Sequence, residues 1–265
     1  MFDISIELST KTIKRLYYYS VIVFLFLNME IKSWKEKFVK INEFSIVIVL
    51  FFQFSFSQNE IDKGFLYLDR FIPNIVFDLR YATVDNFTGK IVEGYENVRP
   101  VSTIEMGKAL EKVQFYLEER GLGLKIFDVY RPQKAVNYFF KWSKVRADTL
   151  MKSKYYPNEK KENLFKNGYI SKLSGHSRGS SVDLTIIYLL GEKAGEEIDM
   201  GSSWDYFGEK SSISTTKINL IQQKNRLILK NLMEMFGFIP YKKEWWHFTL
   251  KDEPFPNKYF DFSTN

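Results

Sequence analysis

The order of strand-like and helical segments after residue 58 constrains the fold of this chain more than any other feature. Apolar residues at helical spacing predict helices that follow a capping box at 102–105 and that cover 132–148 and 217–236. Strand-like runs are expected at 65–68, 75–81, 124–130, 182–190, 238–241 and 246–250. The two kinds of segment alternate irregularly, with hairpin-like strand pairs late in the chain. This order favours an α+β fold, with a central and largely antiparallel sheet flanked by helices, over a doubly wound parallel sheet.

The composition excludes several classes of protein. The 265 residues include no cysteine, so disulfides, cysteine-ligated metals and a thiol nucleophile are ruled out. A hydrophobic content of 45% and an aromatic content of 17% are enough to fill a core, which argues against a disordered chain. The formal charge of +6 is modest and the lysines are scattered among acids, so we expect no nucleic-acid partner.

Two apolar runs, 16–27 and 44–56, distinguish residues 1–58 from the rest of the chain. Each has about a dozen residues, fewer than the roughly 20 that span a membrane comfortably. The second run follows the lysine-bearing segment 32–40 and ends in small polar residues, which is the layout of a secretory signal. Translation could then start at Met29. The alternatives are an uncleaved membrane anchor and two helices packed as a hairpin.

Either interpretation predicts that residues 59–265 form a single exported domain of the bacterial cell envelope. This domain would be periplasmic, or anchored to the membrane and facing the periplasm. Its contact with the membrane would run only through the N-terminal segment. The sequence does not indicate an oligomeric state.

The two histidines of the chain, His176 and His247, lie in short segments that suggest a metal site. His176 occupies a Gly/Ser-rich loop, and Asp183 follows seven positions later on an expected strand. A catalytic zinc site uses three His, Asp or Glu ligands and keeps one position open, so His176, Asp183 and His247 are candidates. Glu244, three residues before His247, would be the general base. Residues three apart on a regular strand face opposite sides, so Glu244 must lie on a turn or beside a bulge.

Simpler interpretations of these residues remain open at this point. Both histidines could be ordinary core or surface residues, with Asp183 capping a turn. Arg131 ends a strand and precedes a helix that would begin at Pro132. Its guanidinium could stabilise an oxyanion, or it could simply pair with Asp128 or a glutamate.

Three motifs, and further stretches at 81–89, 200–202 and 252–262, resemble the zinc D-alanyl-D-alanine dipeptidases of vancomycin-resistance systems, which are peptidases of family M15. The motifs are Ser174-x-His176-x-x-Gly179-x-x-x-Asp183, Glu244-x-x-His247 and Tyr130-Arg131-Pro132. The similarity covers residues 65–262. Its motifs are specific in combination.

The resemblance implies a site in which nearly every candidate has a role. It implies one zinc ion per chain held by His176, Asp183 and His247, with Glu244 as catalytic base and Arg131 as transition-state stabiliser. It further implies that Asp205 and Tyr81 hold the substrate ammonium group, and that Ser174 and Tyr95 help to hold the substrate or its carboxylate.

The implied function is zinc-dependent hydrolysis of a small D,D-dipeptide, D-alanyl-D-alanine, to free D-alanine. One alternative is a D,D- or L,D-carboxypeptidase that trims peptidoglycan stems, and another is a non-catalytic zinc-stabilised binding module of the envelope. Two departures from the family pattern are Gly175 and Ser181, where members often carry Ser and Ala. The export segment also differs from the cytoplasmic resistance enzymes and favours a role in nutrition or wall turnover.

Overall fold

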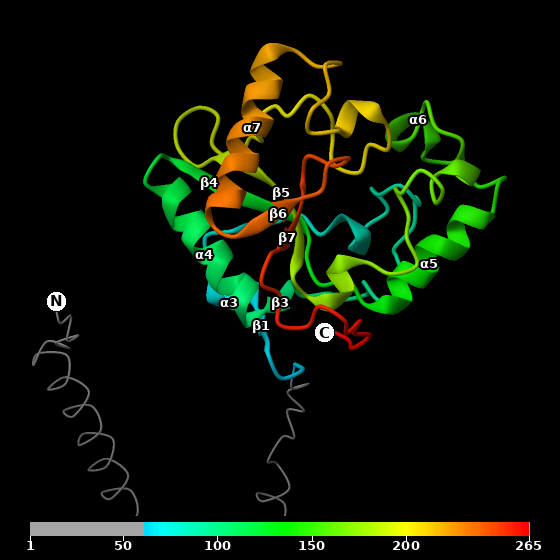
Figure 1. Ribbon diagram of the computed structural model, residues 1–265, viewed down its shortest axis with the longest axis horizontal. Coiled ribbons are helices and arrows are strands. Elements are labelled where there is room, and N and C mark those ends of the chain that lie inside the picture. The colour runs from blue at the N-terminus through cyan, green and yellow to red at the C-terminus, as the bar shows by residue number, and fades with distance from the viewer. Residues whose placement is uncertain (1–60, 265) are drawn as a thin grey trace, which may run out of the picture. The chain divides into compact units, whose positions relative to one another are not determined.

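A five-stranded sheet lies at the centre of the computed structural model, which describes residues 61–264 (Figure 1). Its strands, in spatial order, are β2 (Val76–Phe77), β4 (Leu122–Asp128), β5 (Ser181–Tyr188), β7 (His247–Leu250) and β6 (Phe238–Pro240). Only β2 and β4 pair in parallel, and the other three pairings are antiparallel. A separate two-stranded sheet pairs β1 (Phe65–Tyr67) with β3 (Val101–Thr103). The predicted α+β fold with a largely antiparallel sheet is therefore confirmed.

Helices flank the sheet on both sides. In Figure 1, α4 (Ile104–Glu118) and α7 (Leu220–Met235) lie on one side and α5 (Gln133–Lys144) lies on the other. The shorter helices are α3 (Leu68–Phe71), α6 (Lys152–Tyr155) and the 3₁₀ turns η1 (Arg80–Ala82), η2 (Lys161–Asn163), η3 (Gly175–Arg178) and η4 (Glu209–Ser211).

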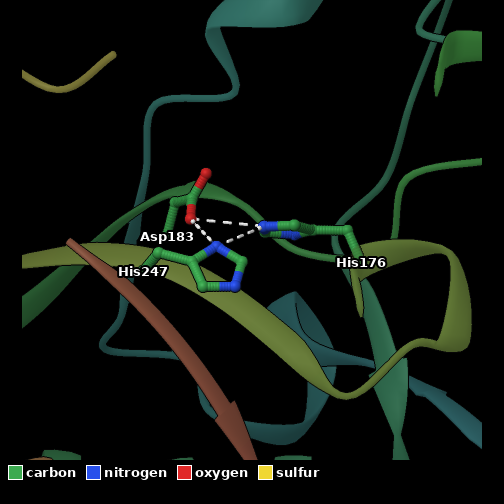
Figure 2. A group of neighbouring side chains, drawn as sticks. All are labelled: His176, Asp183 and His247. Carbon is green, nitrogen blue, oxygen red and sulfur yellow. Dashed lines mark hydrogen bonds and ion pairs between the residues drawn. The ribbon is translucent and has the colours of Figure 1, made fainter. Parts of the chain in front are cut away.

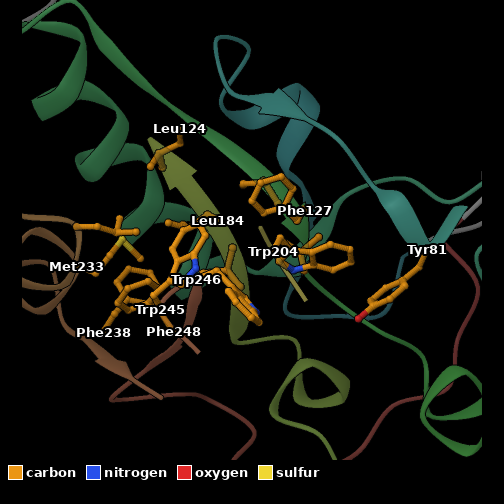
Figure 3. Packing of buried hydrophobic residues seen from close by; sticks show 14 of the residues in the cluster. Tyr81, Leu124, Phe127, Leu184, Trp204, Met233, Phe238, Trp245, Trp246 and Phe248 are labelled. Atoms are coloured by element: carbon orange, nitrogen blue, oxygen red, sulfur yellow. The ribbon is translucent and has the colours of Figure 1, made fainter. Parts of the chain in front are cut away.

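The central strand β5 is buried on both faces because helices and loops cover both sides of it. Alternate residues of a strand point to opposite faces. The face that carries Leu184 packs with Leu124, Met233 and Trp246 in one apolar cluster (Figure 3). The opposite face carries Asp183. Burying polar side chains there is costly unless they find partners, so this second face is where a site is expected.

Three local predictions need correction. The cap of α4 is Thr103, the last residue of β3, whose hydroxyl accepts from Met106 N, whereas the Ser102 hydroxyl donates to Thr103 O. Pro132 is the N-cap of α5 rather than its first residue, and it has extended backbone angles. The strand expected at 75–81 ends at Phe77, after which the chain turns into η1.

The expected export signal or anchor, 1–58, lies outside the described residues. Across positions 61–264, no helix is long and apolar enough to cross a membrane.

Candidate active site

Antiparallel pairing brings acidic and histidine side chains into one row across three strands. Asp183 of β5 lies directly opposite His247 of β7 and is also the register partner of Asp128 at the end of β4. The β4 register shifts between Ile126 and Asp128, so Phe127 is the extra residue of a bulge. Without that bulge, Phe127 and not Asp128 would face Asp183.

Three potential metal ligands meet on this face (Figure 2). Asp183 Oδ1 lies 2.9 Å from His247 Nδ1 and 3.2 Å from His176 Nε2. The two imidazole nitrogens are 3.1 Å apart. These three residues are the ligands predicted from the sequence, and the fold places their side chains together.

The ring of His176 is oriented by the chain around it. Its Nδ1 lies 2.6 Å from the carbonyl oxygen of Val129, which can only accept, so Nδ1 carries the proton. The lone pair of Nε2 therefore points at Asp183 and His247. Ser174 caps the short turn η3 that carries His176, and its hydroxyl accepts from His176 N. Gly179 ends the turn with a φ of 79°, a conformation that favours glycine.

This set of donors fits a zinc ion. The three ligand atoms all lie within 4.8 Å of one another. Zinc bonds of about 2.0–2.2 Å to nitrogen and oxygen place tetrahedral ligands roughly 3.3–3.6 Å apart, slightly wider than the observed separations. Burial lowers the pKa of His247, which favours the neutral form that binds metal. Three protein ligands leave a fourth position open, as in catalytic zinc sites.

Glu244 borders the same cavity, which has a volume of about 240 Å³. It lies on the turn before β7, where Glu244 N donates to Tyr241 O and Glu244 O accepts from His247 N. Because Glu244 lies on a turn and not on the strand, it can face the same side as His247 although the two are three residues apart. Burial, reinforced by the negative charge of Asp183, raises the pKa of Glu244 well above its ordinary value.

Arg131 also lines the cavity and is paired with a buried carboxylate. Its Nε and Nη2 lie 2.9 Å and 2.8 Å from Asp128 Oδ2, and Nη2 lies 3.8 Å from Asp183 Oδ2. Burial opposes the charge of Arg131, but Asp128, acting together with Tyr81, Tyr95 and Asp183, holds the pKa of the guanidinium well above its ordinary value. Arg131 therefore pairs with Asp128 and also lines the cavity, so the two roles considered for it from the sequence are compatible.

Asp205, Tyr81 and Ser174 form other parts of the cavity wall. Asp205 has a left-handed φ of 56°, and its Oδ2 accepts from the Tyr81 hydroxyl at 2.6 Å. Burial and the nearby Asp183 raise the pKa of Asp205 well above its ordinary value. A carboxyl in that state gains stability from a cationic group placed next to it.

Tyr95 occupies a different position from the other candidates. It is fully buried, and its hydroxyl donates to Asp128 Oδ1 at 2.6 Å. Among residues 61–264, those that line the cavity do not include Tyr95. The structure thus places the Tyr95 hydroxyl on the carboxylate that holds Arg131, and a direct contact between Tyr95 and substrate stays a prediction.

Comparison with known proteins identifies the family. A family model for D-Ala-D-Ala dipeptidases, peptidase M15, matches residues 61–265. The chain belongs to this family. It is 42% identical over 204 residues to a D-alanyl-D-alanine dipeptidase of Enterococcus faecalis, covering 77% of this chain and 100% of that protein. A D-alanyl-D-alanine dipeptidase of Streptomyces coelicolor is 41% identical over 198 residues, covering 75% of this chain and 96% of the other.

A solved structure gives a weaker match. It is a mutant of a vancomycin-resistance D,D-pentapeptidase from a VanB-type cassette, in complex with Zn(II). It covers 57% of this chain and 74% of its own, with 14% identity and a TM-score of 0.34.

In this member of the M15 family, two residues that support the site were not predicted from sequence. Asp128 entered only as one partner for Arg131, although it also lies 3.4 Å from His176 Nδ1. Trp204 donates from Nε1 to Asp183 Oδ2 at 3.2 Å. The Asp-x-x-Arg spacing was a usable signal for Asp128, whereas Trp204 had no signal beyond being next to Asp205.

Proposed function

We propose that this chain hydrolyses D-alanyl-D-alanine with a zinc ion held by His176, Asp183 and His247, and with Glu244 as general base. The observation that carries the proposal is the convergence of three ligand atoms beside a half-buried glutamate in a chain of the M15 dipeptidase family. A bound zinc ion supplies Lewis acidity, which polarises the peptide carbonyl and lowers the pKa of water at the site.

Glu244 performs the proton transfers. Its carboxylate takes a proton from the attacking water and delivers it to the nitrogen of the leaving D-alanine. The position of Glu244 supports this role, because it shares the cavity with all three ligands and is held by the turn before β7.

Arg131 stabilises the negative charge that develops on the carbonyl oxygen. Asp128 fixes the guanidinium through Nε and Nη2, so the remaining N–H donors are preorganised and need no rearrangement during the reaction. Tyr95 acts indirectly: its hydroxyl donates to Asp128 and so orients the carboxylate that holds Arg131.

The substrate amino terminus binds at Asp205 and Tyr81, and Ser174 contacts the other end of the substrate. A free ammonium group supplies the buried Asp205 with an adjacent cationic partner, which stabilises its charged form. The cavity of about 240 Å³ is small beside the roughly 300–1,000 Å³ of sites for drug-sized ligands. Both features favour a dipeptide over a peptidoglycan stem, whose acylated nitrogen carries no charge.

The proposed setting is the envelope side of the cytoplasmic membrane. The charged segment 32–40 and the apolar run 44–56 support export, with any membrane contact made through this segment. Cell fractionation followed by N-terminal sequencing tests the proposal. A chain that begins after the apolar run indicates a cleaved signal, an intact chain in the membrane indicates an anchor, and an intact chain in the cytoplasm contradicts export.

The assay that tests the proposed function compares substrates of different length. Zinc-loaded protein is given D-alanyl-D-alanine and, separately, a pentapeptide stem that ends in D-alanyl-D-alanine. We expect rapid release of D-alanine from the dipeptide and little from the stem. Equal rates on the two substrates would instead identify a carboxypeptidase, and no release from either would favour a binding module.

A further inference from the structure

Arg226 is a buried charge outside the active-site cavity. Its side chain projects from the middle of α7, and the residue is 1% exposed. Burial lowers the pKa of the guanidinium to about 10, so burial carries a real cost. Neutral oxygens surround it: its hydrogen bonds go to three backbone carbonyls and one hydroxyl. A buried charge that is solvated by backbone dipoles indicates a structural constraint on the segments that supply them.

The carbonyls that Arg226 binds lie at the two ends of one loop, residues 200–212. Nε donates to Met200 O at 2.6 Å, where the loop begins. Nη1 donates to Lys210 O at 2.9 Å and to Ser212 O at 2.8 Å, where it ends. Asp205 lies between these ends, in a left-handed conformation. One guanidinium therefore closes the loop that presents Asp205 to the cavity.

The fourth bond connects this loop to the Glu244 turn. Arg226 Nη2 donates to Ser202 Oγ at 3.1 Å, and Trp245 Nε1 donates to the same oxygen at 3.0 Å. Trp245 follows Glu244 in the chain, and its backbone N donates to Ser211 O at 3.0 Å. The loop that carries Asp205 and the turn that carries Glu244 are thus tied to each other through Ser202, Ser211 and Arg226.

We infer that Arg226 is a positioning residue that holds Asp205 at the correct distance from Glu244 and so sets the preference for substrates with a free ammonium group. Only a planar fork of donors can reach Met200 O, Ser212 O and Ser202 Oγ together, and a lysine ammonium is a point donor. This inference rests on the proposed function, in which Asp205 binds the substrate amino terminus.

The test compares two substrates, D-alanyl-D-alanine and its N-acetylated form, which has no ammonium group. The ratio of their kcat/KM values measures recognition of the charge and is insensitive to a uniform loss of active protein. We expect Arg226→Lys to reduce this ratio by about 10- to 100-fold, since a misplacement of about 1 Å can cost 100-fold. Zinc content should stay at the parental level, because the three ligands lie on η3, β5 and β7.

Two further variants keep the test decisive. Arg120→Lys is the matched control, because Arg120 is a half-exposed arginine that follows α4 and does not line the cavity; it should leave the ratio unchanged. Ser202→Ala removes the shared oxygen while keeping Arg226, and it substitutes for Arg226→Lys if that protein does not fold. The ratio should fall in this variant too.

Combination with Asp205→Asn separates the inference from the proposed function. If Arg226 acts through Asp205, the double variant has the same ratio as Asp205→Asn alone. An unchanged ratio in Arg226→Lys and Ser202→Ala, beside a reduced ratio in Asp205→Asn, would overturn the inference and leave the proposed function intact. An unchanged ratio in Asp205→Asn, or no cleavage by the parent protein, would overturn both.

Discussion

Replacing Gly175 by serine should destabilise this protein, because the new side chain would overlap one neighbouring atom. A Cβ built at Gly175 would lie 2.3 Å from Ser181 Oγ, far inside contact distance. Other atoms around that Cβ are no closer than 3.4 Å, namely Arg178 Nη2 and Ser181 Cβ. Glycine at 175 and serine at 181 therefore fit each other, because the hydroxyl of Ser181 occupies the space that a side chain at 175 would need.

The magnitude follows from what must move. Forcing extra atoms into a packed site costs about 1–3 kcal/mol. If Ser181 Oγ rotates away, its 2.7 Å bond to Thr249 Oγ1 is lost, at about 1 kcal/mol. Either response relieves the overlap, so we expect Gly175→Ser to lower the free energy of unfolding by roughly 1–3 kcal/mol. Because His176 is the next residue, zinc affinity should fall as well.

A double-mutant cycle measures the effect. Urea unfolding at fixed free zinc is recorded for the parent, Gly175→Ser, Ser181→Ala and the double variant, since bound metal contributes to stability. Ser181→Ala alone should cost about 1 kcal/mol. The double variant should cost no more than Ser181→Ala, because the atom at 2.3 Å is gone. Chelator competition on the same proteins reports zinc affinity.

The cycle has a clear refuting result. If Gly175→Ser lowers the unfolding free energy equally with serine or alanine at position 181, the two sites are independent and the steric argument is wrong. A Gly175→Ser protein as stable as the parent would refute it too.

Three further predictions concern other parts of the domain. Glu244→Gln should lower kcat by about 100- to 10,000-fold while elemental analysis finds zinc retained; full activity would exclude the general-base role. Arg131→Lys should lower kcat by about 100- to 1,000-fold with a smaller change in KM, because lysine cannot pair with Asp128 and also stabilise an oxyanion; steady-state kinetics that show only a KM change would contradict this. Burial lowers the pKa of Lys161 from 10.5 to about 8, so between these pH values the unfolded chain binds more protons and stability rises with pH. This rise, about 2–3 kcal/mol, should be absent from urea unfolding of Lys161→Met; an identical rise in that variant would refute the assignment.

Local patterns were sufficient to predict most elements and most of the site. The helical spacing that ends at Gly237 predicted α7, and the apolar run 182–190 predicted β5, because these signals depend on residues close in the chain. The ligand candidates were visible for a similar reason: the chain has two histidines, so few metal sites were possible. Element ends were less accurate, since competition between a strand and a cap at Ser102 and Thr103 depends on which segment pairs with β3.

The sequence by itself thus determined the fold class, the residue types of the site and the family. Only the tertiary structure decided which side chains meet. The register that sets Asp183 opposite His247, across 64 residues, is a long-range property that no local pattern encodes. No sequence pattern predicted the bulge at Phe127 either, yet it places Asp128 opposite Asp183 and beside Arg131. Arg226 reads in sequence as an ordinary helical arginine. Its function follows only from the backbone oxygens that the folded chain places around it.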